Sequence, residues 1–310
     1  MKILITGGAG YIGSVLVNEC IKLNYDITVI DTFKYSQTSL LHCCNYPKLR
    51  LIKGDCRDKE LIKNELQKAD CIIPLACLVG APLCESQPFE AASINRDSIF
   101  LILDFLSKSQ KLIFPCTNSG YGIGKDNIFC TETSDLNPIS TYGKLKVEAE
   151  KRIIDNGNGI TLRLATVFGV SPRMRLDLLV NDFTYKALRE KSIVLFESHF
   201  KRNYIHIQDV VQCFIHCLNN YEKMNNETYN LGLSNANLSK KELCHEIEKI
   251  IGPFEIIETH GKKDPDQRNY IVSNEKIENT GFKASTSLEI GIKELVRAYT
   301  ALHPIPFRNY

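Results

Sequence analysis

The first 31 residues place a short apolar strand, a glycine-rich turn and an amphipathic helix in direct succession. Residues 2–6 read KILIT, and glycines follow at positions 7, 8, 10 and 13. Glycine is favoured in such a turn because it adopts backbone angles that other residues resist. The next apolar positions have helical spacing: Ile12, Leu16, Cys20 and Leu23. A second apolar run, residues 26–30, ends at Asp31, so the pattern predicts a strand–turn–helix–strand unit.

This unit is typical of a dinucleotide site. Glycines let a pyrophosphate approach the backbone, and amides at the start of the helix face the anion. The spacing is GxxGxxG, and Asp31 can accept hydrogen bonds from ribose hydroxyls and would repel a 2′-phosphate, which favours NAD over NADP. A turn that only packs helix against strand is the alternative, but the flanking elements and the acid favour binding. The predicted cofactor contacts are Gly7, Gly10, Tyr11, Ile12, Gly13 and Asp31.

Charge and hydropathy exclude several classes of protein. The chain has 310 residues and a formal net charge of +2, with acidic and basic residues interspersed, so no basic face for nucleic acid or a membrane surface is expected. No apolar run approaches the roughly 18 residues of a membrane span, and the apolar start is too short for a signal peptide. We expect a cytoplasmic protein with no nucleic-acid or membrane partner.

The twelve cysteines do not predict a metal site or disulfides, because no CxxC pair occurs. His42, Cys43 and Cys44 are the only ligand-like group, and adjacent residues seldom complete a tetrahedral site without distant partners. Cys213 and Cys217 lie on the apolar face of a helix expected to begin near Asp209, where small hydrophobic side chains belong. No bound metal is expected.

Alternating strands and helices predict an α/β fold. Apolar runs occur at residues 3–6, 27–30, 49–52, 71–74, 111–114 and 161–164. Such alternation makes a Rossmann-type, doubly wound parallel sheet, with ligands beyond the carboxyl ends of its strands. We expect an NAD-binding domain over residues 1–170, to which later segments return, and a smaller C-terminal α/β substrate lobe over residues 171–310.

Two helices of the second half carry clear sequence signals. Ser239 and Glu242 form a capping box, and Gly252-Pro253 would end that helix. A last helix is expected over residues 288–301, where apolar residues recur with helical spacing.

Tyr142 and Lys146 form the main catalytic candidate. On a helix, positions i and i+4 share a face, so the phenol and the ammonium can address one ligand. A free tyrosine has a pKa of about 10 and is a poor base at neutral pH unless positive charge stabilises the phenolate. YxxxK alone would fit an exposed helix surface, but here it follows a dinucleotide pattern, and Thr117 and Ser119 lie at an earlier strand end.

The chain resembles the extended short-chain dehydrogenase/reductases, in the branch of nucleotide-sugar epimerases and dehydratases. The resemblance covers essentially the whole chain and rests on residues 6–13, Asp31, Gly54-Asp55, residues 117–122, Tyr142 with Lys146, and residues 202–209. It implies that Tyr142 accepts the proton, that Lys146 binds the nicotinamide ribose and lowers the tyrosine pKa, and that Thr117 hydrogen-bonds the sugar hydroxyl being oxidised. It also implies cofactor contacts at Asp55, Cys56, Leu75 and Ala76, and a C-terminal lobe that binds the nucleoside diphosphate.

Asn118 and Ser119 depart from the dehydratase pattern, in which Asp-Glu follows the active threonine. Loss of water needs an acid and a base, and an amide cannot protonate a leaving hydroxide. The sequence therefore disfavours 4,6-dehydration. No single residue excludes epimerisation at C4, which needs the ketone to rotate and be reduced on its other face.

A narrower resemblance is to the GDP-heptose 4-dehydrogenases of bacterial capsule biosynthesis. It rests on residues 74–82, 118–124, 163–169, 171–181 and 264–268. These enzymes oxidise the C4 hydroxyl of GDP-D-glycero-α-D-manno-heptose with tightly held NAD, and 2-oxoglutarate is a candidate reoxidant. The resemblance implies substrate contacts at Thr117, Asn118, Ser119 and Asn181. Guanidinium groups grip phosphate oxygens, so the candidates for the diphosphate are Arg173, Arg175, Arg202 and Arg268, of which the last two are favoured.

Two other functions remain open from the sequence. One is an NAD-dependent nucleotide-sugar 4-epimerase. The other is a redox sensor that binds NAD(P) without turnover, although such proteins commonly lose the tyrosine, the lysine or the glycine pattern, and this chain keeps all three. The family often pairs subunits through helices that flank the sheet, one of which carries Tyr142, so the resemblance also implies a homodimer.

Overall fold

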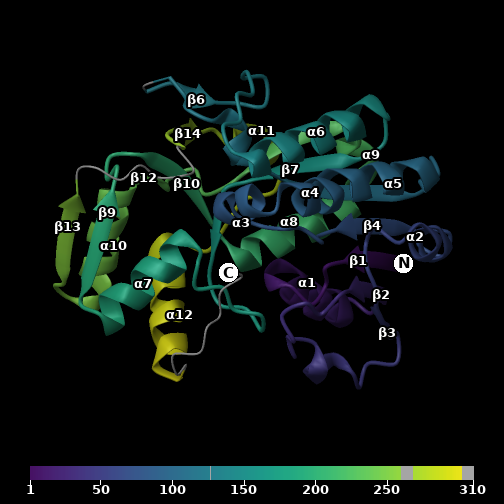
Figure 1. The fold of residues 1–310 in the computed structure, drawn as a ribbon, viewed down its shortest axis with the longest axis horizontal. Coiled ribbons are helices and arrows are strands. Elements are labelled where there is room, and N and C mark those ends of the chain that lie inside the picture. Colours follow the sequence, from purple (N-terminus) through teal and green to yellow (C-terminus); the bar gives the residue numbers. More distant parts are fainter. Residues whose placement is uncertain (126, 260–267, 302–310) are drawn as a thin grey trace.

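A seven-stranded parallel sheet forms the centre of the computed structural model, which describes residues 1–125, 127–259 and 268–301. The strand order is β11-β7-β5-β4-β1-β2-β3, so the chain changes direction across the sheet between β1 and β4. Figure 1 labels β7, β4, β1, β2 and β3 of this sheet. The bounds are β1 Lys2–Thr6, β2 Asp26–Asp31, β3 Leu49–Lys53, β4 Cys71–Pro74, β5 Lys111–Thr117, β7 Ile160–Leu164 and β11 Glu227–Leu231. Ligand sites in such sheets lie at this switch point.

Helices cover both faces of the sheet. In β1, Leu4 points to one face and packs in a core with residues of α2, α5 and α6, while Ile3 and Ile5 join the larger core that contains α1 and α8. This alternation follows from the two-residue repeat of a strand. The helices are α1 Tyr11–Lys22, α2 Lys59–Leu66, α5 Ser98–Phe105, α6 Thr141–Asp155 and α8 Ile207–Asn219. The predicted doubly wound α/β fold is therefore confirmed.

The second half of the chain builds smaller sheets beside the central one (Figure 1). Strand β10 pairs with β8 and β12, and β9 pairs with β13, while α7, α10 and α12 pack on one another. Their bounds are β8 Thr166–Phe168, β9 Ser192–Phe196, β10 Lys201–His206, β12 Asn237–Ser239, β13 Glu255–Thr259, α7 Leu179–Arg189, α10 Lys240–Ile251 and α12 Leu288–Ala301. The division near residue 170 stays a prediction, and β11 of the second half completes the central sheet.

The sequence signals for α10 and α12 are confirmed. Ser239 and Glu242 form the predicted capping box, Gly252 caps the end of α10, and α12 has the predicted bounds. The remaining elements are short: β6 Phe129–Cys130, β14 Ile271–Val272, α3 Ala81–Ser86, α4 Pro88–Ala92, α9 Tyr221–Met224, α11 Glu275–Glu278, the 3₁₀ turns Leu41–Cys43 and Asn118–Tyr121, and the π-helical turn Ser93–Asp97.

Within the described ranges, no helix is both long and apolar enough to cross a bilayer. No group of three His, Cys, Asp or Glu side chains in the same ranges could hold a metal ion, and all twelve cysteines are free thiols.

Candidate active site

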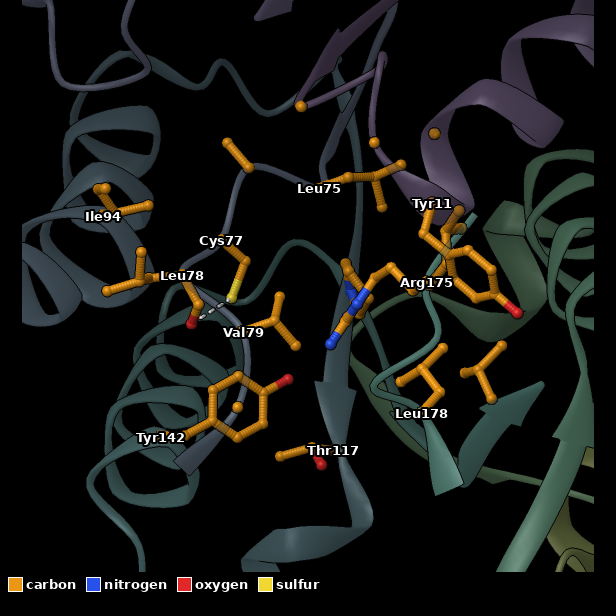
Figure 2. A pocket seen from close by; sticks show the side chains of 18 of the residues that line it. Tyr11, Leu75, Cys77, Leu78, Val79, Ile94, Thr117, Tyr142, Arg175 and Leu178 are labelled. Carbon is orange, nitrogen blue, oxygen red and sulfur yellow. Dashed lines mark hydrogen bonds between the residues drawn. The ribbon is translucent and has the colours of Figure 1, made fainter. Parts of the chain in front are cut away.

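A cavity of about 750 Å³ opens at the carboxyl ends of the central strands. The glycine turn, the ends of β2, β4 and β5, and the start of α6 line it together with the loop between β8 and α7. Figure 2 shows Tyr142, Thr117, Cys77 and Arg175 around this cavity. Its volume lies within the range of small-molecule sites, and its polar side chains gather from segments far apart in the sequence.

The glycine turn has the shape that a bound pyrophosphate needs. Gly7 has φ +71°, and a Cβ there would lie 2.5 Å from the backbone nitrogen of Ala76. A Cβ at Gly13 would lie 2.5 Å from the carbonyl oxygen of Gly7, so both positions require glycine. Gly10 caps the start of α1 without a side-chain bond, which leaves the first helical amides free for an anion. These positions therefore fit a dinucleotide.

The predicted contacts Gly7, Gly10, Tyr11, Ile12 and Gly13 all line the cavity. Tyr11 is tied to the second half of the chain, because its hydroxyl donates to the Gly169 carbonyl at 2.7 Å. The turn is thus fixed to the loop that carries the arginines described below.

Asp31, at the end of β2, is buried at the wall of the cavity. Its carboxylate accepts hydrogen bonds from the backbone amides of Ala9 at 3.0 Å and Phe33 at 2.8 Å and from the Gln37 side chain at 3.2 Å. Burial raises the Asp31 pKa, and the amides of Phe33 and Ala9 oppose that rise. The side chain is therefore held rigidly where it can accept from a ribose hydroxyl.

We predict that this carboxylate sets the cofactor preference. The wild-type protein should bind NAD far more tightly than NADP, and Asp31→Ala should narrow the gap by weakening NAD about tenfold through loss of ribose hydrogen bonds and by removing the repulsion of a 2′-phosphate. Titration of the two cofactors measures both affinities. Asp26→Ala, at the opposite end of β2, is the matched control. Equal wild-type affinities for NAD and NADP would refute the assignment.

The four other predicted cofactor contacts, Asp55, Cys56, Leu75 and Ala76, also line the cavity. Asp55 is paired with Arg57, whose Nε and Nη2 donate to it at 2.9 and 2.6 Å, and this lowers the Asp55 pKa. Burial raises the pKa of the Cys56 thiol to about 12, so it stays protonated. Sequence reasoning missed Arg57, a further lining residue.

Tyr142, Lys146 and Thr117 meet in the same cavity, as the sequence predicts. Ser140 caps the start of α6, which places Tyr142 and Lys146 one turn apart on one face of the helix. Thr117 ends β5 and donates to the Ser119 hydroxyl at 3.0 Å. The Lys146 ammonium lies 3.8 Å from the centre of the Phe114 ring. The arrangement can bring a sugar hydroxyl to a phenol, an ammonium and a threonine hydroxyl.

The surroundings of Tyr142 disfavour its charged form in the absence of ligands. Burial raises its pKa well above the ordinary value of 10.0, the thiols of Cys77, Cys116 and Cys84 act in the same direction, and the positive charge of Arg175 opposes them. A base at this position needs nearby positive charge to ionise near neutral pH.

Asn118 and Ser119 lie in the 3₁₀ turn after β5, buried behind the residues that line the cavity. Ser119 accepts a hydrogen bond from Nη1 of Arg268 at 2.9 Å. Within the described part of the chain, neither polar atom of the Asn118 side chain has a hydrogen-bond partner. Ser119 therefore supports Thr117 and Arg268 through hydrogen bonds, and it does not itself line the cavity.

All four candidate arginines line the cavity. The Arg173 guanidinium lies 5.1 Å from the centre of the Tyr35 ring, which belongs to the loop after β2, so Arg173 faces the side where a dinucleotide would lie. Arg202 comes from β10 and Arg268 from the segment before β14. Of the resemblance segment 264–268, residues 264–267 lie outside the described residues.

The structure does not bring Asn181 to the cavity, contrary to the predicted substrate contact. Asn181 is fully buried in α7, where its Oδ1 accepts from the Gly169 amide at 3.0 Å. Its Nδ2 donates to the Arg175 carbonyl at 2.8 Å and to the Tyr11 hydroxyl at 3.3 Å. All of these contacts are within the protein, so Asn181 holds the loop that carries Arg175.

The sequence of this chain is similar to a family of known proteins. The family described as "NAD dependent epimerase/dehydratase family" matches residues 3–232, which include the glycine turn and the Tyr142–Lys146 pair. A putative UDP-glucose 4-epimerase of Methanocaldococcus jannaschii is 28% identical over 306 residues, covering 95% of this chain and 97% of the relative.

Solved structures share the fold over nearly all of the chain. Pal from Bacillus thuringiensis matches with a TM-score of 0.88 at 19% identity, covering 98% of this chain and 100% of that chain. The UDP-glucose 4-epimerase of Thermotoga maritima with UDP-glucose matches with a TM-score of 0.84 at 25% identity, covering 97% and 99%.

Proposed function

Since the chain belongs to the NAD-dependent epimerase/dehydratase family, we propose that it uses NAD to oxidise the C4 hydroxyl of a nucleotide sugar. The observation that carries this proposal is the convergence of Tyr142, Lys146 and Thr117 in one cavity with the glycine turn and Asp31. A non-catalytic sensor would not require a base, an ammonium and a hydroxyl at the same end of the cofactor site.

In this proposal the protein residues perform the proton transfer. Tyr142, as the phenolate, takes the proton of the C4 hydroxyl, while Thr117 holds the sugar oxygen by a hydrogen bond. Lys146 binds the nicotinamide ribose, and its charge favours the phenolate. NAD, when bound against the glycine turn, supplies the acceptor for the hydride. General-base catalysis by a positioned side chain contributes a factor of about 10² to 10⁴ to the rate.

The residues after Thr117 support an outcome without dehydration. Asn118 and Ser119 stand where an acid pair would be needed, and neither can protonate a leaving hydroxide. Both are also buried behind the wall of the cavity. We therefore propose that the 4-keto sugar keeps all its hydroxyl groups except the oxidised one.

We propose GDP-D-glycero-α-D-manno-heptose as the substrate, in capsular polysaccharide biosynthesis. The support for this choice is the sequence resemblance in residues 74–82, 118–124, 163–169 and 171–181. The buried Arg202 guanidinium, together with Arg268, would grip the diphosphate. In the same proposal 2-oxoglutarate reoxidises the cofactor, and the protein is a cytoplasmic homodimer that pairs through helices flanking the sheet.

A nucleotide-sugar 4-epimerase is the second candidate. The Methanocaldococcus jannaschii relative bears that description, and the same three residues could return the hydride to the opposite face of a rotated ketone. The two candidates differ in whether reduced cofactor remains after the reaction.

The first test is spectroscopic. Purified protein is incubated with NAD and, separately, with GDP-heptose, GDP-mannose and UDP-glucose, and the near-ultraviolet absorbance of reduced nicotinamide is followed. The proposal predicts net reduction with the GDP-heptose and its decay after addition of 2-oxoglutarate. No net reduction with any sugar, accompanied by inversion at C4, would favour the epimerase.

A further inference from the structure

Arg175 reaches the reaction end of the cavity from the loop between β8 and α7 (Figure 2). Its side chain is one-tenth exposed, and its Nε donates to Asp177 Oδ1 at 3.1 Å while its Nη2 donates to Asp177 Oδ2. This two-point pairing uses one edge of the guanidinium. Among the described residues, none accepts a hydrogen bond from Nη1 of Arg175. The N–H groups on the other edge of the guanidinium therefore remain available.

The loop that carries Arg175 is fixed at several points. Asn181 holds the Arg175 carbonyl, and Tyr11 holds the Gly169 carbonyl. The Ser171 hydroxyl donates to the Tyr11 carbonyl at 2.7 Å and lies 3.0 Å from the Ser14 hydroxyl in α1. The position of Arg175 is therefore set by the same elements that form the glycine turn.

Several groups on neighbouring elements act on Tyr142. Burial of the ring disfavours a phenolate, and negative charge on the sulfurs of Cys77, Cys84 or Cys116 would add to this effect, whereas the positive charge of Arg175 opposes it. Burial lowers the Arg175 pKa, but Asp177, with Tyr11 and Tyr142, brings it above the ordinary value, so Arg175 stays charged. Other charged groups near the start of α6 include Lys144 in its first turn, Lys146 on the same helix face as Tyr142, and Glu85, which accepts from the Thr141 amide at 3.0 Å.

We propose that Arg175 is a positioning residue of the reaction centre: held by Asp177, its guanidinium is a second positive charge, besides Lys146, that favours the phenolate form of Tyr142. This inference rests on the proposed role of Tyr142 as the base. It adds a residue outside the YxxxK pair to the groups that act on Tyr142. It also assigns a function to the buried Arg175–Asp177 pair, which holds the guanidinium in position.

The test is the titration of Tyr142 in the NAD-loaded protein. Isotopically labelled tyrosine is followed by NMR, and the Tyr142 resonance is identified by its absence in Tyr142→Phe. Arg175→Gln should raise the midpoint of the Tyr142 titration by about one pH unit or more, as expected when an opposite charge within a few ångströms is removed. Arg175→Lys should give a midpoint between the two. Arg152→Gln removes the same charge from the exposed far end of α6, outside the cavity, and is the matched control, with a midpoint close to wild type.

A second variant distinguishes an effect of the Arg175 charge from a purely structural role of Arg175. Arg175→Gln leaves the buried Asp177 carboxylate unpaired, so the double variant Arg175→Gln/Asp177→Asn restores a neutral pair. If Arg175 acts by its charge, the double variant keeps a raised midpoint. If it only supports the loop, the double variant returns to wild type, which overturns the proposal. Equal midpoints in wild type and Arg175→Gln, or a wild-type Tyr142 that never titrates while the protein is folded, also overturn it.

Turnover gives an independent readout. Loss of positive charge should slow oxidation most at low pH, with the rates of wild type and Arg175→Gln converging as pH rises and both phenols ionise. A constant loss at every pH contradicts the proposal. Because the NMR titration needs no sugar, a shifted midpoint without any sugar oxidation would reject the proposed function alone, and sugar oxidation without a shifted midpoint would reject the role of Arg175 alone.

Discussion

Tyr142→Phe is expected to leave NAD binding intact and to lower turnover by a factor of about 10² to 10⁴, the usual worth of a positioned acid–base group. The substitution removes one hydroxyl and keeps the partly buried ring, which packs against the cluster that contains Leu78 and Leu145, so the wall of the cavity should persist. Cofactor affinity by titration and the rate of nicotinamide reduction with the sugar substrate measure the two effects separately.

Tyr46→Phe is the matched control, because the Tyr46 hydroxyl bonds the Tyr25 carbonyl at 3.0 Å and Tyr46 is not among the residues lining the cavity. Burial raises the Tyr142 pKa, so the phenolate fraction grows with pH and wild-type turnover should increase with pH. The residual rate of Tyr142→Phe should lack this dependence. A Tyr142→Phe rate close to that of the wild type would mean that another residue is the base.

Arg163→Met is expected to lower the free energy of unfolding by about 3–5 kcal/mol, because it leaves a buried carboxylate without its partner. Arg163 in β7 and Glu150 in α6 are each about one-twentieth exposed, and Arg163 Nη2 donates to Glu150 at 2.7 Å. Arg163 Nη1 also donates to the Tyr121 hydroxyl at 2.9 Å. Urea unfolding measures the change.

An exposed ion pair provides the comparison. Lys249→Met breaks the surface pair with Glu246 and should cost at most about 1 kcal/mol. The double variant Glu150→Leu/Arg163→Met removes both buried charges and should recover much of the lost stability. Similar losses for Arg163→Met and Lys249→Met would contradict the account of the buried pair. Since Glu150 lies on α6, the helix that carries Tyr142, this pair also anchors that helix to the sheet.

The sequence predicted the central sheet because local patterns determine it. The apolar runs at residues 3–6 and 27–30 are buried strands between helices, and each strand end brings polar residues to the same edge. The glycine turn, Asp31 and Tyr142 were predicted as site residues because each belongs to a short motif with fixed spacing. The structure places all of them around one cavity, and their chemical roles stay predictions.

Other features depend on contacts that no local pattern encodes. Strands β6 and β14 have two residues each and exist only through their pairing with each other. Asn181 was predicted to contact the substrate because it lies in a segment that carries the narrower resemblance. In the structure its side-chain amide forms hydrogen bonds with Gly169, Arg175 and Tyr11 instead. The pairing of Arg175 with Asp177 was equally hidden, although their i, i+2 spacing in a loop rich in arginine was a signal.

The mass of the sugar product distinguishes oxidation at C4 from epimerisation and from dehydration. Wild-type protein, NAD and GDP-D-glycero-α-D-manno-heptose are incubated with 2-oxoglutarate, and the nucleotide sugar is analysed by mass spectrometry and NMR. Oxidation at C4 should give a product lighter than the substrate by two hydrogens, with a ketone at C4 and an exchangeable proton beside it. A product of unchanged mass with inverted C4 would show an epimerase, and a product lighter by one water would contradict the interpretation of Asn118.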